Sequence, residues 1–145
     1  MRSKLLDQRD GQRTYALVFD SGEDAEEGLL SFVRNEAVSA ASVTGVGGFS
    51  VVDLGFFDTE KREYRHILVH QQVEVLSFVG NVALQADGSP KVHAHVVVGL
   101  EDGTTRGGHL FANSVKPTLE VVLTEEPAQL RRRTDPATGL ALLDV

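Results

Sequence analysis

The spacing of hydrophobic and polar positions changes character along the chain. Residues 14–19, TYALVF, combine β-branched and aromatic side chains and predict a strand that ends at residues 20–22. Apolar residues then recur at helical spacing, which predicts one amphipathic helix across residues 22–36. Ser21 is expected to cap the N-terminus of this helix, and Asp24 to return the capping hydrogen bond.

From Ser39 onward, short apolar or alternating segments are separated by polar turns. These turns are expected at residues 58–61, 87–90 and 101–104. One helix with seven or eight strands joined by short turns predicts an α+β fold, with a mainly antiparallel, barrel-like sheet and one principal helix packed on it. No repeat or linker divides the chain, so a single domain over residues 1–145 is expected.

Three glycines, Gly45, Gly47 and Gly48, lie between two apolar segments and predict a strand, a bend and a second strand. Glycine-rich loops also hold phosphate groups. Here TGVGG is followed by strand-like residues and lacks the helix start and the lysine of a phosphate loop, which argues against a nucleotide site.

Composition narrows the chemistry. The 145 residues are 41% hydrophobic, which is enough for a core, and the absence of cysteine excludes disulfides and thiolate metal ligands. No apolar run approaches the roughly 20 residues of a membrane-spanning helix, and the N-terminal residues lack the apolar stretch of a secretory signal. We therefore expect a cytoplasmic protein that does not use a membrane as a partner.

The charge is acidic, with a formal net value of −7, and this disfavours a protein whose whole surface neutralises nucleic-acid phosphates. The one basic cluster is Arg131-Arg132-Arg133. Adjacent arginines of this kind are most often solvated or ion-paired, and the alternative is contact with an anion.

Two histidines, His93 and His95, alternate with apolar residues. Alternate residues of a strand share a face, so both histidines point away from a core face formed by Val92, Ala94, Val96 and Val98. The following turn contains Asp102, and an antiparallel loop centred on that residue places His95 opposite His109. This register requires a loop with an odd number of residues or a bulge, for which Gly107-Gly108 is a natural position.

Three imidazoles brought together in this way suit a divalent transition metal, most of all zinc. Cross-strand neighbours have Cβ atoms about 4.5–5.5 Å apart, which lets their rings reach one ion at about 2.0–2.1 Å. Three protein ligands leave a position for water or substrate, as in catalytic zinc sites. The alternative is three unrelated strand histidines. His66 and His70 have no partner in this register and are expected near the surface.

Several segments, in their order and spacing, resemble the plants-and-prokaryotes-conserved (PPC) domain family. They are EVLSFVGN (74–81), Pro90, HAH (93–95), GGHL (107–110) and TLEVVL (118–123), together with RTYALVFDSGED near the start and DPATGL near the end. The resemblance covers nearly the whole chain. One departure is Ala112-Asn113, where the family often has glycine after GGHL.

This resemblance implies a homotrimer with a metal-binding unit that falls on His93, His95 and His109. The family includes plant nuclear proteins in which the domain follows an AT-hook, so a DNA-binding designation is also implied. The chain has no Arg-Gly-Arg-Pro element of an AT-hook, which argues against direct DNA binding. The family fold is also similar to that of acetolactate decarboxylase, whose zinc is likewise held by three histidines.

Two functions follow as hypotheses. In the first, the chain is a homotrimeric interaction module that retains a metal ion, and the apolar segments VVDLGFF, HILV and VEVLSFVG associate with other copies. In the second, it is a zinc-dependent enzyme that acts on a small oxygen-rich molecule, with a carboxylate that moves a proton. Glu74 and Glu120 are the candidate carboxylates, and a solvated or structural glutamate is the alternative for each. Asn81 is interpreted as a turn residue.

Overall fold

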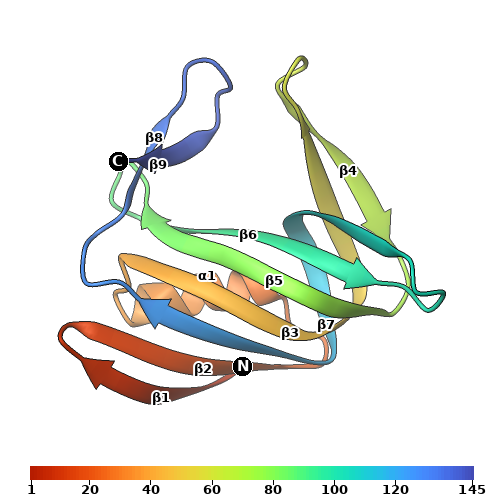
Figure 1. Cartoon of the computed structure of the whole chain (residues 1–145), viewed down its shortest axis with the longest axis horizontal. Coiled ribbons are helices and arrows are strands. Elements are labelled where there is room, and N and C mark those ends of the chain that lie inside the picture. The colour runs from red at the N-terminus through yellow and green to blue at the C-terminus, as the bar shows by residue number, and fades with distance from the viewer.

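One sheet that curves back on itself carries the fold, and a single helix packs against it (Figure 1). The computed structural model describes residues 1–145. The helix α1 spans Ala25–Asn35, and the strands are β1 (Arg2–Arg9), β2 (Gln12–Asp20), β3 (Ala40–Asp58), β4 (Glu63–Val69), β5 (Val73–Leu84), β6 (Pro90–Gly99), β7 (Thr105–Glu125), β8 (Arg131–Thr134) and β9 (Ala141–Asp144). All pairs except β5–β8 are antiparallel, so the predicted α+β class is confirmed.

Four of the strands close on themselves and give the sheet its barrel-like form. β3 pairs with β5, β5 with β6, β6 with the first residues of β7, and β7 returns to pair with β3. β7 pairs with β3 along one edge. Along its other edge, its first residues pair with β6 and its later residues pair with β2. The length of β7 therefore lets one strand join β6 to β2.

The apolar core fills the space between the sheet and the helix. Helix residues Ala25, Leu29, Phe32 and Val33 are buried in it, as the helical spacing requires. Strand residues at alternate positions supply the rest, including Val92, Ala94, Val96 and Val98 of β6, each at most 4% exposed. The opposite face of β6, which carries the histidines, is consequently the outer face of the sheet.

The three closely spaced glycines lie within β3, so the predicted division into two strands is wrong. A Cβ added at Gly47 would lie 2.3 Å from the carbonyl oxygen of Thr118, and one at Gly48 would lie 2.3 Å from that of Lys116. The register of β3 against β7 shifts around these positions. The glycines therefore let β3 bend while it stays paired with β7.

The helix begins later than the sequence pattern predicts, and Ser21 is not its cap. Asp24 is the N-cap, and its Oδ1 accepts a hydrogen bond from the Glu27 N–H at 2.9 Å. Gly22 has φ of +91°, a conformation that suits a turn before the helix. With 11 residues, α1 does not reach the length needed to cross a membrane.

The hydrophobic pattern predicts neither β1 nor the β8–β9 hairpin. Every residue of β1 is exposed, and the eight residues of β8 and β9 include a single buried one, Arg132. Strands without an apolar face lack the period-two signal from which strands are inferred.

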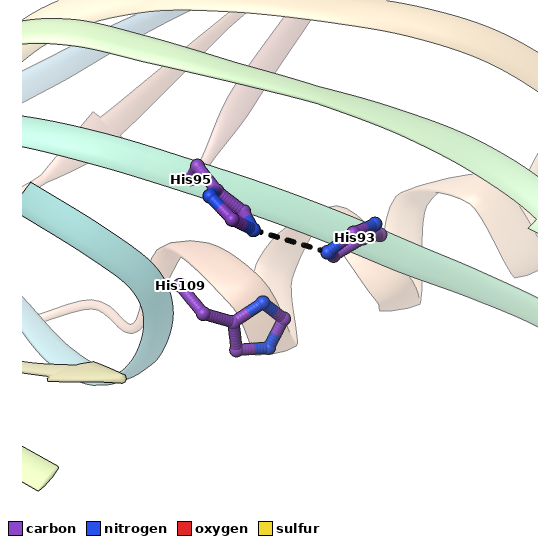
Figure 2. A group of neighbouring side chains, drawn as sticks. All are labelled: His93, His95 and His109. Atoms are coloured by element: carbon purple, nitrogen blue, oxygen red, sulfur yellow. Dashed lines mark hydrogen bonds between the residues drawn. The ribbon is translucent and has the colours of Figure 1, made fainter. Parts of the chain in front are cut away.

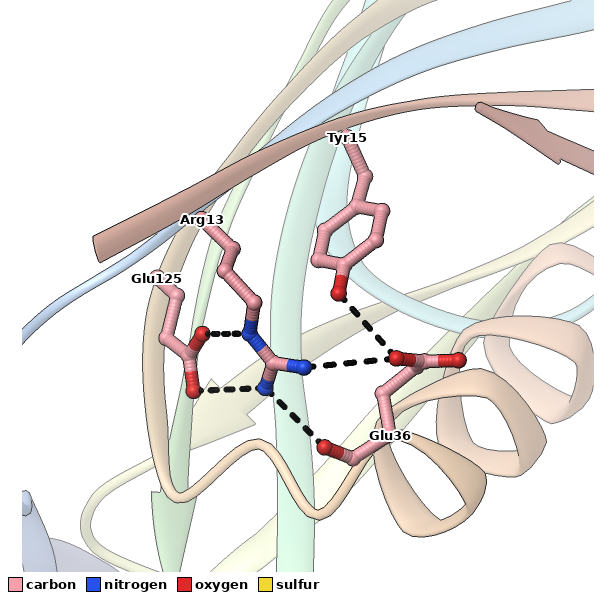
Figure 3. A network of polar contacts seen from close by, with 4 residues as sticks. All are labelled: Arg13, Tyr15, Glu36 and Glu125. Carbon is pink, nitrogen blue, oxygen red and sulfur yellow. Dashed lines mark hydrogen bonds and ion pairs between the residues drawn. The ribbon is translucent and has the colours of Figure 1, made fainter. Parts of the chain in front are cut away.

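An ion-pair network ties the C-terminal end of α1 to the sheet (Figure 3). Arg13 of β2 contacts both carboxylate oxygens of Glu125, with Nε to Oε2 at 2.5 Å and Nη2 to Oε1 at 3.0 Å. The same guanidinium reaches the Glu36 carboxylate at 3.3 Å, and the Tyr15 hydroxyl donates to that carboxylate at 3.0 Å. Helix end, β2 and β7 are thus fixed to one another.

Candidate metal centre

Three histidines from two paired strands meet on the outer face of the sheet (Figure 2). His93 and His95 lie two residues apart on β6, and His109 of β7 is the direct cross-strand partner of His95. The ring centroids are 5.0 Å apart for His93–His95, 5.1 Å for His93–His109 and 5.4 Å for His95–His109. The register predicted from the sequence is confirmed.

The loop between β6 and β7 sets this register. Five residues, 100–104, separate the paired residues Gly99 and Thr105, and the pairing then runs without a shift to His95 and His109. The loop is closed by the Leu100 N–H, which donates to the Thr104 carbonyl oxygen at 2.9 Å. The odd loop length therefore brings His109 onto the histidine face, and the β6–β7 pair contains no bulge.

Two glycines beneath the cluster serve close packing of the strands. A Cβ at Gly108 would lie 2.6 Å from the carbonyl oxygen of Gly55, and a Cβ at Gly55 would lie 2.4 Å from the Phe111 ring. Gly55 is the cross-strand partner of His109 on β3. The missing side chain of Gly108 allows β3 to approach β7 beside the third histidine, and that of Gly55 leaves room for the Phe111 and Tyr64 rings.

The positions of the nitrogens fit a single metal ion. The ligand atoms of the three histidines lie within 4.8 Å of one another. The Nε2 atoms of His93 and His95 are 3.2 Å apart, near the roughly 3.3 Å that separates two nitrogens on one tetrahedral zinc ion. The Nδ1 of His109 is buried and has no hydrogen-bond partner. A metal ion would supply this group with the polar partner that the protein does not provide.

The electrostatics also fit a metal. Burial, followed by the charges of Arg132 and His95, lowers the pKa of His93 to about 4. Burial, followed by the charges of His93 and His95, lowers the pKa of His109 to about 4. Both rings are consequently neutral at neutral pH and have a lone pair to offer. Neutral imidazoles suit zinc, iron, nickel and copper far better than magnesium or calcium.

Access to the cluster is open on one side. His95 is exposed, whereas His93 and His109 are half-buried. An ion held by the three rings would keep at least one coordination position toward solvent, where water or a small ligand can bind.

The structure does not bring the candidate carboxylates to the cluster. Glu74 lies opposite Gly99, four residues along β6 from His95, and Glu120 lies eleven residues along β7 from His109. Both side chains are exposed. The even spacing of Glu74 and Phe78 would place both on one face of a regular strand. A bulge between Val75 and Ser77 reverses the alternation of β5, so Glu74 is exposed while Phe78 is buried.

A carboxylate–imidazole pair that the sequence pattern does not indicate lies on the same outer face. His66 Nδ1 is 2.7 Å from Asp53 Oδ2, and the other oxygen of Asp53 is buried without a partner. The ring of Phe111 lies 4.7 Å from His66 and 4.8 Å from His109. His66 is exposed, as predicted, and one strand, β3, lies between its strand and that of His109.

Arg132 is connected to the cluster through Asn81. Asn81 is the direct cross-strand partner of His93 within β5, so its interpretation as a turn residue is wrong. Its side-chain oxygen accepts a hydrogen bond from Nη2 of Arg132. The sequence gives no signal for this contact, because it depends on a hairpin formed by the exposed C-terminal segment. His70 is exposed and is not part of the cluster.

The curved sheet with three convergent histidines defines a β-rich domain with a candidate metal centre. More specifically, the chain belongs to the Plants and Prokaryotes Conserved (PCC) domain family, whose model matches residues 6–127. The family resemblance predicted from the sequence motifs is thereby confirmed.

Solved structures of this family are closely similar. A plant- and prokaryote-conserved protein from Pyrococcus horikoshii is 35% identical, with a TM-score of 0.85 and coverage of 92% of each chain. A metal-containing protein from Archaeoglobus fulgidus is 28% identical, with a TM-score of 0.84 over 100% of this chain and 99% of that one. A protein from Ralstonia eutropha JMP134, whose name proposes DNA binding, is 28% identical, with a TM-score of 0.83 over 90% of each chain.

Two other similarities concern part of a longer protein or the fold alone. The bifunctional protein GlmU of Synechococcus sp. (strain JA-3-3Ab) is 32% identical over 136 residues, 92% of this chain, which spans about a fifth (20%) of that curated relative. The α-acetolactate decarboxylase of Bacillus subtilis strain 168 is 16% identical, with a TM-score of 0.59 over 90% of this chain and 60% of that one. The latter similarity is one of fold.

Proposed function

We propose that this chain is a self-associating PCC domain that binds one divalent transition-metal ion, preferably zinc, through His93, His95 and His109. The observation that carries the proposal is the convergence of three imidazoles, two of them neutral at neutral pH, around a buried His109 Nδ1 without a partner. The metal-containing relative from Archaeoglobus fulgidus supports it.

Elemental analysis of protein purified without a histidine tag tests the metal proposal. We expect close to one zinc or comparable ion per chain, and a melting temperature that rises when zinc is returned to metal-free protein. His95→Ala should lose this binding, whereas His66→Ala, an exposed histidine outside the cluster, should retain it. Absence of stoichiometric metal together with no response to added zinc would refute the proposal.

Self-association is supported by an exposed apolar surface next to the cluster. Five side chains make up this outer apolar face: Val46, Leu76, Val79, Val97 and Val122, which are 56%, 54%, 49%, 41% and 43% exposed. A groove of about 490 Å³ runs between several of them. Val79 pairs directly with His95, so the apolar face continues into the histidine face.

We infer that further copies of the chain cover this face in a homotrimer, because cyclic symmetry repeats one interface without leaving an unmatched surface. Light scattering should give a mass of about three times 15.7 kDa, and this mass should not change over a hundredfold dilution. Val79→Asp should dissociate the trimer, whereas Leu142→Asp, an equally exposed position on β9, should not. A monomer throughout the dilution series would refute this part of the proposal.

A second candidate function, a metal-dependent enzyme acting on a small oxygen-rich molecule, is favoured by the Asp53–His66 pair. Asp53 holds the Nδ1 of His66, which leaves Nε2 free to accept a proton from a ligand or return it. The bound metal would supply polarisation of a carbonyl oxygen. The pair takes the place of Glu74 and Glu120 as the candidate for proton transfer.

Isotope exchange tests this second candidate. Zinc-loaded protein in D₂O should exchange the protons next to the carbonyl of hydroxyacetone faster than either metal-free protein or His66→Gln, as followed by proton NMR. Nitrogen chemical shifts of His66 should show the proton on Nδ1, and this readout does not depend on activity. Equal exchange rates in wild-type and His66→Gln protein would remove the enzymatic role of His66.

A further inference from the structure

A buried arginine beside the histidine cluster has no opposite charge. Arg132 is 6% exposed, and its hydrogen bonds go to two neutral groups, the Asn81 side-chain oxygen and the Ala141 carbonyl oxygen. Its Nε is buried and has no partner. Burying a guanidinium without a counter-charge is unfavourable. An anion bound at Arg132 would supply the missing negative charge.

The neighbouring arginines behave differently, so the burial of Arg132 does not come from the basic run itself. Arg131 and Arg133 are exposed, and they bind Gln129 and Asp144 respectively. The alternation of β8 turns the middle residue inward, and the pairing of Arg131 with Leu84 fixes β8 at the end of β5. The interpretation of the run as solvated therefore holds for its outer members and is wrong for Arg132.

The position of Arg132 relative to the cluster follows from Asn81. Asn81 and His93 are cross-strand partners on one face, with Cβ atoms separated by about 4.5–5.5 Å in such pairs. The guanidinium that binds Asn81 is close enough to His93 for its charge to lower the pKa of that ring. Asp87 lines the same hollow as Arg132, but its carboxylate accepts hydrogen bonds from Ser89 and makes no ion pair.

We propose that Arg132 is an anion-binding subsite of the three-histidine centre and that the natural ligand is a small molecule with a carboxylate group. The carboxylate lies on the guanidinium, and a hydroxyl or carbonyl oxygen of the same molecule takes the open position at the cluster. Arginine suits this role because its planar fork matches a carboxylate. The proposal rests on the metal binding proposed above.

The test compares glycolate with its neutral analogue glycolamide on cobalt-loaded protein, using the visible spectrum of the metal. The metal itself favours a carboxylate over an amide. The test therefore rests on how much each variant changes the affinity for each probe, and not on the difference between the probes in wild-type protein. Arg132→Gln should weaken glycolate binding about tenfold, the value of one charge-assisted contact, and change glycolamide binding less than about twofold. Arg131→Gln, which removes an adjacent exposed charge, should leave both affinities unchanged.

Several outcomes would overturn the subsite. They are an unchanged glycolate affinity in Arg132→Gln, an equal loss for both probes, and a similar loss in Arg131→Gln. If Arg132→Gln fails to fold, Arg132→Lys keeps the charge without the fork and should still weaken glycolate at least about threefold. Full affinity in that variant would count against the proposal.

Metal content distinguishes a failure of the anion subsite from a failure of the metal centre. Equal cobalt stoichiometry in wild-type and Arg132→Gln protein, with loss of glycolate binding alone, supports the subsite. If wild-type protein holds no metal, the metal proposal fails, and the subsite is then judged on metal-free protein. Glycolate should raise the melting temperature of metal-free wild-type protein more than that of Arg132→Gln, and equal shifts would refute it.

Discussion

Asp24 and Asn113 cap the helix jointly across the width of the fold. The Asn113 side-chain oxygen accepts a hydrogen bond from the Ala25 N–H at 2.9 Å, and the backbone N–H of Asn113 donates to Asp24 Oδ2 at 3.1 Å. Asn113 is only 8% exposed. The departure from glycine at this position therefore has a structural role, because β7 supplies a hydrogen-bond acceptor to the first turn of α1.

Removing this acceptor should destabilise the protein. Asn113→Ala leaves the Ala25 N–H buried without a partner, and we expect a loss of about 1–3 kcal/mol in the free energy of unfolding. Asn113→Asp keeps the acceptor oxygen but buries a charge beside Asp24 and removes the amide that donates to the Phe111 carbonyl oxygen, so it should cost at least as much. Urea denaturation of metal-free protein measures both losses, and an unchanged midpoint in Asn113→Ala would show that the hydrogen bond does not stabilise the protein.

Close packing beneath His109 predicts a second effect. Gly108→Ala places a Cβ against the β3 backbone and should cost about 1–3 kcal/mol of stability by overpacking. By moving β7, it should also weaken zinc binding about tenfold or more, as mutations that reorient ligands do. Gly99→Ala meets only the flexible Leu76 side chain and serves as the control. Competition with a chelating indicator measures the affinity, and unchanged binding in Gly108→Ala would contradict the expectation.

Acid should destabilise the metal-free protein before its carboxylates titrate. The folded pKa values of His93 and His109, about 4, lie below the ordinary value of 6.5, so the unfolded state binds more protons between these limits. The stability from these two groups is present above pH 6.5 and is lost as the pH falls toward 4. Denaturant midpoints at pH 7.5, 6 and 5 should therefore decrease. The double variant His93→Gln, His109→Gln should flatten this slope, and a flat wild-type profile would refute the assignment.

The Arg13 network should contribute more than an exposed ion pair. The Arg13 and Glu125 side chains are 25% and 13% exposed, whereas those of Arg9 and Asp7 are 80% and 49% exposed. Arg13→Ala removes the guanidinium from the Glu125 and Glu36 carboxylates, of which Glu36 keeps the Tyr15 hydroxyl, and should cost about 1–3 kcal/mol. Arg9→Ala should cost less than about 1 kcal/mol. Thermal and urea denaturation compare them. Similar losses of stability in Arg13→Ala and Arg9→Ala would show that the network stabilises the protein no more than an exposed ion pair does.

DNA binding is expected to be weak at physiological salt. The chain has a net charge of −7, and Arg132, one of its three adjacent arginines, is buried. Few cations are therefore available to displace counterions from a duplex. Fluorescence anisotropy with a labelled duplex, repeated across a salt series, measures this. Sub-micromolar binding with a steep salt dependence would contradict the expectation.

Local patterns were sufficient to predict the histidine cluster. The alternation around His93 and His95 identifies the core face, and the short loop after it fixes the partner of His95. Both signals lie within about one hairpin, where strand period and loop length determine geometry. The helix is predicted for the same reason, although its cap is not, because Asn113 acts from a distant strand.

The surroundings of the cluster depend on contacts that no local pattern encodes. His66 reaches the histidine face only through the pairing of β4 with β3 and of β3 with β7, and the latter contains several register shifts. Glu74 is displaced by a bulge that no glycine or proline announces. Arg132 looks like its two neighbours in sequence, and only the β8–β9 hairpin distinguishes it.

The 21-residue strand β7 carries His109, Asn113 and Glu125, and so sets the distances between the histidine cluster, the helix cap and the Arg13 network. One inserted or deleted residue within it would turn every later side chain to the opposite face. During divergence, length changes should therefore accumulate in the turns at residues 59–62, 86–89 and 135–140. The number of residues between His109 and Glu125 should therefore be the same in relatives that keep the histidine cluster, the helix cap and the Arg13 network.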